Sequence, residues 1–285
     1  MLTYEFIQRA LVVSTVTAVI AGLLSCWLVL IGWSLMGDAV SHAVLPGVVV
    51  SYIVGWPFAV GALIAALVAV GLVGGVRERT TLKGDTAIGV VFTALFALGL
   101  VLVSVTPAGT NLQEILFGNL LGISQDALIQ VLIFGVIAFV VMVTLRRSIT
   151  AWAFDPAHAR AVGMPTGLIR GAVMVCLALV VVAAMQAVGV ILVVAMLITP
   201  GATAYLLTRR FSRMLLIAPL VAWVSSVAGI CLSYWTDVSA GGTIVLVQAG
   251  IFVLVYLFAP REGLVTAPLR RNLQRAADGT ARQPS

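Results

Sequence analysis

Asp38 and His42 are the residues whose types and spacing could hold a metal ion. They stand four residues apart in an otherwise apolar stretch, so on a helix both side chains lie on one face. A carboxylate oxygen and an imidazole nitrogen one turn apart form half of a site for a divalent transition metal. An ionisable residue deep in an apolar segment marks a functional site by default. We therefore expect both residues to be metal ligands; the alternative is a helix-capping Asp38 and a His42 packed against a backbone carbonyl.

Pro46 strengthens the metal interpretation, because proline has no N–H and leaves the carbonyl of His42 free to act as a further ligand. Gly37 and Gly47 bracket the segment and would let the backbone bend, as in the broken helices around ion sites of transporters. Pro200 is a second place of this kind. We predict broken helices near residues 34–50 and 196–203, although Pro200 could also be a simple kink.

The composition identifies the environment of these residues. Hydrophobic residues make up 62% of the 285 positions and charged residues 9%, and the mean hydropathy is +1.18, whereas an average soluble domain is roughly 25% charged. This small number of charged side chains cannot cover the surface of a soluble protein. We therefore predict an all-α polytopic membrane protein. The net charge of +6 reflects topology rather than a nucleic-acid partner. The three cysteines have no metal or disulfide spacing and are expected to be small core residues.

The basic residues predict the topology. All Lys and Arg residues except Arg9 fall within residues 77–83, 146–170, 209–213 and the stretch from 261 onward. The positive-inside rule places these stretches in the cytoplasm, and apolar segments of about 20 residues cross between them. This gives about nine transmembrane helices, with eight possible, because residues 10–76 fit three spans with the N-terminus outside or two spans and a broken segment with it inside. Residues 1–263 form the transmembrane domain, and residues 264–285 a basic, disordered cytoplasmic tail.

The cytoplasmic loop over residues 146–170 contains a short helix. Asp155 followed by Pro156 is a typical helix start, with an acidic cap and proline at the first position. Gly163, followed by Met-Pro, ends the helix. A short capped helix on this side suits docking of a soluble partner; the alternative is a surface helix resting on lipid headgroups.

The chain from Arg9 to Gly263 resembles the membrane permease subunit of the manganese/zinc/iron ABC importers, the ABC-3 family, and looks most like its manganese permeases. The resemblance is carried by residues 37–47, 85–89, 116–119 with Ser124, 154–163 and 195–203. Gly201 departs from the pattern, because the family leads us to expect alanine there.

The resemblance implies roles for the residues already singled out. Asp38 and His42 would contact the metal within the membrane. The coupling helix, which seats on a separate ATPase subunit, would include Phe154, Asp155, Ala159 and Gly163. The chain has no Gly-x-x-x-x-Gly-Lys-Ser/Thr phosphate loop, so we expect a transport subunit that is not an enzyme.

We therefore expect a permease half in the bacterial cytoplasmic membrane, with its C-terminus inside. It pairs with a second copy, contacts membrane lipid, receives a divalent cation from an extracytoplasmic metal-binding protein and carries no permanent cofactor. Mn²⁺ is preferred, and Zn²⁺ or Fe²⁺ is possible. The alternative is an ion-coupled secondary metal transporter using Asp38. An intramembrane aspartyl protease would need two carboxylates in one site, and no second Asp lies as deep.

Overall fold

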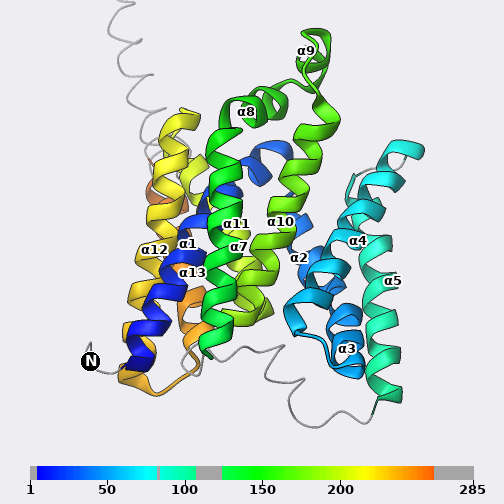
Figure 1. Ribbon diagram of the computed structural model, residues 1–285. Coiled ribbons are helices and arrows are strands. Elements are labelled where there is room, and N and C mark those ends of the chain that lie inside the picture. The colour runs from blue at the N-terminus through cyan, green and yellow to red at the C-terminus, as the bar shows by residue number, and fades with distance from the viewer. Residues whose placement is uncertain (1–4, 82–83, 107–123, 260–285) are drawn as a thin grey trace, which may run out of the picture.

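The computed structural model describes residues 5–81, 84–106 and 124–259, and every regular element in this part of the chain is a helix. The expected all-α fold is therefore confirmed. The helices are α1 (Glu5–Ile31), α2 (Ser34–Ala43), α3 (Leu45–Val54), α4 (Phe58–Arg79), α5 (Gly84–Val105), α7 (Gln125–Thr144), α8 (Arg146–Phe154), α9 (Pro156–Ala161), α10 (Thr166–Val188), α11 (Val190–Leu207), α12 (Phe211–Thr236) and α13 (Ala240–Phe258) (Figure 1). Residues 116–119 and the boundary between domain and tail near residue 263 lie outside the described residues.

Eight helical stretches in the described residues are long and apolar enough to cross a membrane, with α2 and α3 together forming one of them. The apolar helix α11 is shorter and makes nine when it is included. The first apolar region forms three of these stretches: α1, the α2–α3 pair and α4. The chain turns between α10 and α11 at Gly189, whose φ is +80°.

Apart from Arg9, the basic residues of the described chain gather at one end of the molecule. Helices α8 and α9 lie at this end, and the beginning of α1 lies at the opposite end together with α3 (Figure 1). Arg146 and Arg147 open α8, and Arg77 and Arg79 lie in the last turn of α4. The positive-inside rule predicts that the end with α8 and α9 faces the cytoplasm.

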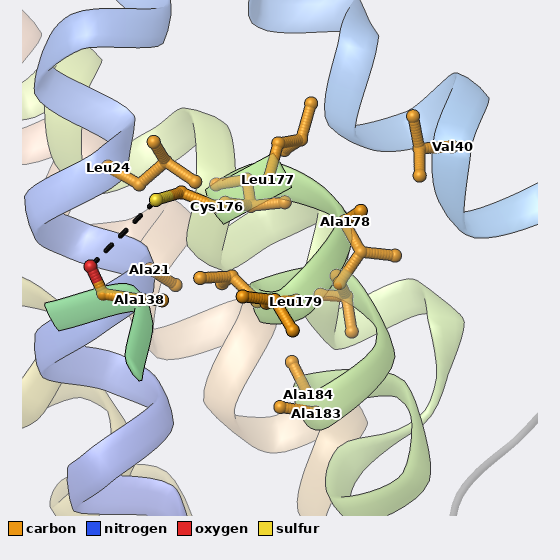
Figure 2. Close-up of a cluster of buried hydrophobic side chains, with 14 of the residues drawn as sticks. Ala21, Leu24, Val40, Ala138, Cys176, Leu177, Ala178, Leu179, Ala183 and Ala184 are labelled. Carbon is orange, nitrogen blue, oxygen red and sulfur yellow. Dashed lines mark hydrogen bonds between the residues drawn. The ribbon is translucent and has the colours of Figure 1, made fainter. Parts of the chain in front are cut away.

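Helix α10 forms the centre of the core. In its most apolar stretch 72% of the residues are buried, against 17% in α5 and in α13. Around Cys176, small and branched side chains of α10 pack against Leu24 of α1 and Ala138 of α7 (Figure 2). The thiol of Cys176 lies 3.9 Å from the carbonyl oxygen of Ala138. Cys176 and Cys26 are buried free cysteines, as expected for small core residues, whereas Cys231 is only half-buried.

Candidate functional site

Helix α2 holds Asp38 and His42 side by side, as their spacing predicts. Their nearest atoms, Oδ1 of Asp38 and Nε2 of His42, are 3.4 Å apart. The side chains are 39% and 33% exposed respectively, so the pair is neither packed away nor fully at the surface. An ion approaching this face of α2 meets both groups.

The separation of these two atoms fits one shared metal ion. Oxygen and nitrogen ligands about 2.1 Å from a transition-metal ion, at angles between a right angle and the tetrahedral angle, are about 3.0–3.4 Å apart. The described residues contain no group of three or more His, Cys, Asp or Glu side chains that could complete a site. The pair is therefore half of a metal site rather than a whole one.

Two aromatic rings of α5 orient His42. The His42 ring lies 5.6 Å from the Phe92 ring and 5.5 Å from the Phe96 ring, centroid to centroid. The Phe96 contact is edge-to-face, a favourable arrangement that restricts the ring. Sequence analysis missed both phenylalanines; the only available signal was their own spacing of one helical turn, which does not say which helix they face.

The first predicted break is present between α2 and α3. Helix α2 ends at Ala43 and α3 begins at Leu45, with Pro46 in its first turn. The N–H of Val44 donates to the carbonyl of Val40 at 3.2 Å and also faces the carbonyl of His42. Proline at residue 46 supplies no N–H to that carbonyl. The interruption is confined to Val44, two residues after His42, where the backbone keeps helical dihedrals (φ −72°, ψ −23°) and the N–H of Val48 still donates to the carbonyl of Val44.

Gly37 and Gly47 flank this break but do not lie at it. Gly37 is inside α2, where a Cβ would lie 2.7 Å from Cδ1 of Leu197 on α11. Gly47 is inside α3, where a Cβ would overlap the carbonyl of Gly61 on α4. Both glycines thus allow α2 and α3 to approach neighbouring helices, rather than allowing the backbone to bend as expected.

The second expected break, near residues 196–203, is not observed, because α11 continues through Pro200. Ser25 of α1 inserts at this point. The N–H of Gly201 donates to Oγ of Ser25 at 2.9 Å, and the Ser25 hydroxyl donates to the carbonyl of Ile198 at 3.3 Å. A Cβ on residue 201 would lie 2.7 Å from the Ser25 carbonyl oxygen, which explains glycine where alanine was expected.

The predicted cytoplasmic helix is present as α9. The carboxylate of Asp155 accepts hydrogen bonds from the N–H groups of Ala157 and His158 at 2.9 and 2.8 Å, and Gly163 ends the element with a φ of +80°. Ala159 is buried, whereas Phe154 is 61% exposed. A fixed short helix with an exposed aromatic side chain beside it is suited to contact another protein.

Helix α8 connects this element to the helix that carries Asp38. Trp152 of α8 contacts Trp33 edge-to-face, with ring centroids 5.8 Å apart, and Trp33 is the N-cap residue of α2. Nε1 of Trp27 on α1 donates to the Thr150 hydroxyl at 3.1 Å. Packed side chains therefore connect α8, which directly precedes α9 in the chain, to the start of α2.

Comparison with known proteins gives consistent results. Residues 3–259 match the ABC 3 transport family. The manganese transport system membrane protein MntB of Synechocystis is 46% identical over 270 residues, covering 95% of this chain and 88% of that protein. A probable iron transport system membrane protein of Haemophilus influenzae is 45% identical, covering 90% and 95% of the two chains.

Solved structures share the fold. A chain of PsaBC from Streptococcus pneumoniae in complex with Fab superposes with a TM-score of 0.82 and 38% identity, covering 91% of this chain and 94% of that one. An inward-facing conformation of a putative metal-chelate type ABC transporter gives a TM-score of 0.70 at 17% identity, covering 88% and 85%. The second structure supports the fold alone.

Proposed function

Because the chain belongs to the ABC 3 transport family, we propose that it is the permease subunit of an ATP-binding-cassette importer that moves a divalent transition-metal ion inward. The observation that carries this proposal is the Asp38–His42 pair, whose facing atoms are 3.4 Å apart on a membrane-spanning segment. The Asp38 carboxylate compensates the charge of the ion. The imidazole of His42 raises affinity for first-row transition metals over Mg²⁺ and Ca²⁺.

The pair requires further ligands, and a second copy of the chain supplies them. Asp38 and His42 are each about one-third exposed, so two copies facing one another across a central pathway bring two such pairs to one ion. The carbonyl of His42, which residue 46 does not bond, is a further candidate ligand. Metal coordination is thereby shared between the two copies.

Energy for transport comes from a separate ATPase subunit, since this chain is a transport subunit and not an enzyme. Phe154, Asp155, Ala159 and Gly163 form or flank α9, the surface that the ATPase contacts. The chain of contacts from α8 to Trp33 connects that surface to α2. An extracytoplasmic metal-binding protein delivers the ion at the opposite face, and the C-terminus lies on the cytoplasmic side with the other basic segments.

Manganese is the preferred cargo. The protein ligands of each half-site are one carboxylate and one imidazole, without a thiolate, and oxygen-rich sites favour Mn²⁺ over Zn²⁺. The names of similar proteins include both manganese and iron transport. Uptake by the whole complex in the presence of competing Mn²⁺, Zn²⁺ and Fe²⁺ ranks the three ions, and Mn²⁺ is expected to compete best.

Uptake of radioactive manganese by cells that express the complete importer tests the site. Asp38→Ala is expected to abolish uptake while the protein remains in the membrane at wild-type abundance. Asp126→Ala is the matched control, because Asp126 is an exposed acid in the first turn of α7, and it should leave uptake unchanged. Normal uptake by the Asp38→Ala variant would remove Asp38 from the metal site.

The energy source is tested separately in vesicles. An importer driven by ATP keeps its uptake when a protonophore collapses the proton gradient and loses it when the ATPase subunit is inactivated. The reverse pattern would identify an ion-coupled secondary transporter in which Asp38 is the coupling carboxylate.

A further inference from the structure

A second site lies at the cytoplasmic end, away from Asp38 and His42. A pocket of about 450 Å³ opens beside α4, α10 and the α8–α9 segment. Arg77 of α4, Arg160 of α9 and Arg170 of α10 line it, and no acidic residue of the described chain does so. Three positive charges from three separate elements at one concave surface favour an anion there.

The guanidinium of Arg77 is the strongest indication that an anion binds in this pocket. Its carbon lies 5.1 Å from the centre of the Trp33 ring, a cation–π contact that holds the group in place. Its Nη1 is buried and has no hydrogen-bond partner among the described residues. A buried donor of this kind requires an acceptor.

The residues that line the pocket indicate the class of ligand. Guanidinium groups bind phosphate oxygens with paired N–H donors. The same pocket is lined by apolar surface from Ile31, Trp152 and Met174. Two other residues of its lining, Arg77 and Thr166, stand at the ends of helical stretches that are apolar enough to cross a membrane. Basic pockets between transmembrane helices on the cytoplasmic side are typical binding places for anionic lipid headgroups.

A neighbouring pocket shows that these features are not general at this end. It has a volume of about 460 Å³, and its lining includes one arginine, Arg209, with Phe154, Tyr205 and Phe211. A pocket of similar size therefore has three aromatic residues and one arginine in its lining. Of these two pockets, only the one around Arg77 brings three arginines together.

We propose that Arg77, Arg160 and Arg170 bind the phosphate group of an anionic phospholipid from the cytoplasmic leaflet. The lipid headgroup is held between α4 and α10 and touches α9 through Arg160, so its occupancy stabilises the element that faces the ATPase. The binding itself does not depend on which ion is transported.

Lipid retention by the purified full-length protein tests this proposal. The protein is titrated with dioleoylphosphatidylglycerol or dioleoylphosphatidylcholine, and bound lipid is counted by native mass spectrometry. Wild type is expected to retain the anionic lipid preferentially. Arg77→Gln with Arg160→Gln is expected to weaken that retention about tenfold, as the loss of charge-assisted hydrogen bonds predicts. Arg147→Gln, which removes an exposed charge of α8 outside the pocket, is the control and should match wild type.

Two further arms make the result decisive. Arg160→Gln alone alters an exposed side chain and should give a partial loss even if the double variant misfolds. Inorganic phosphate, added with and without lipid in a thermal-stability assay, separates the two sources of the phosphate group: arginine-dependent stabilisation by phosphate alone identifies a soluble ligand. Equal retention of lipid and phosphate by wild type and both pocket variants would overturn the proposal. So would variants that lose only their association with the ATPase subunit, because the pocket would then be a protein-docking surface.

Discussion

Two prolines inside membrane-spanning segments give opposite outcomes in this molecule. Beside Pro46, helix α2 ends and helix α3 begins, with only Val44 between them. At Pro200 the helix α11 continues from Val190 to Leu207. Both prolines lack an N–H and deprive the carbonyl four residues earlier of its donor, so the proline itself cannot account for the difference.

The neighbouring helices differ at the two positions. At Pro200, Ser25 of α1 accepts the N–H of Gly201 and donates to the carbonyl of Ile198, which fastens the backbone beside the proline to α1 in a place where water cannot bond it. Near Pro46, the contact described between the backbones of α3 and α4, at Gly47 and Gly61, is steric. Helix α12 also continues through a proline, Pro219, so of these three prolines only Pro46 lies at an interruption, which is beside the proposed metal ligands.

The largest loss of stability is expected when a Cβ is added at Gly201, where α11 lies against the backbone of α1. In Gly201→Ala the new Cβ meets the backbone of Ser25, 2.7 Å from its carbonyl oxygen, and backbone cannot move aside as a flexible side chain does. Separation of α1 from α11 should lower the free energy of unfolding by about 2–3 kcal/mol. Denaturation of the purified protein in SDS or by heat measures this.

Gly250→Ala is the matched control for that substitution. Nothing lies within 4 Å of a Cβ built on Gly250 in α13, and alanine favours a helix over glycine by up to about 1 kcal/mol. Its stability should therefore be unchanged or raised. Wild-type stability of Gly201→Ala would mean that α1 and α11 do not need their close contact.

A smaller effect is expected from removing the inserted hydroxyl. Ser25→Ala leaves the Gly201 N–H and the Ile198 carbonyl without this partner, and interhelical hydrogen bonds in membranes are worth roughly 0.6–1.7 kcal/mol. The free energy of unfolding should fall by about 1 kcal/mol. Ser226→Ala is the control, because the Ser226 hydroxyl donates only within its own helix, to the carbonyl of Ala222. If both variants behave alike, Ser25 does not hold α11 together.

Local rules predicted a large part of this structure from the sequence. The shared face of Asp38 and His42 and the capped helix between Asp155 and Gly163 depend on residues within two turns of one another, and both are present. The apolar spans followed from the positions of the basic residues, since crossing a membrane depends on length and charge.

The features that could not be predicted from the sequence depend on which helices pack together. Ser25 and Gly201 are 176 residues apart, and Phe92 and Phe96 reach His42 from another helix. A single sequence carries no signal for such pairings, because any apolar face of one span can pack against several others. For this reason the break at Pro200 was expected and the aromatic contacts of His42 were not.

The smallest effect on stability, with the sharpest effect on transport, is expected from Pro46→Ala. Alanine supplies an N–H to the carbonyl of His42 and allows α2 and α3 to join. The new hydrogen bond, worth about 1 kcal/mol, is opposed by lost packing of a buried ring and by a more flexible unfolded chain, so stability should change by less than about 1 kcal/mol. Metal uptake should nevertheless fall several-fold, because that carbonyl is then occupied and the break beside the ligands is closed.

Pro200→Ala, measured in the same uptake and denaturation assays, should retain uptake, since α11 is already continuous there. Full uptake by Pro46→Ala would show that transport does not need the interruption, and equal losses in both variants would show that the two prolines act alike.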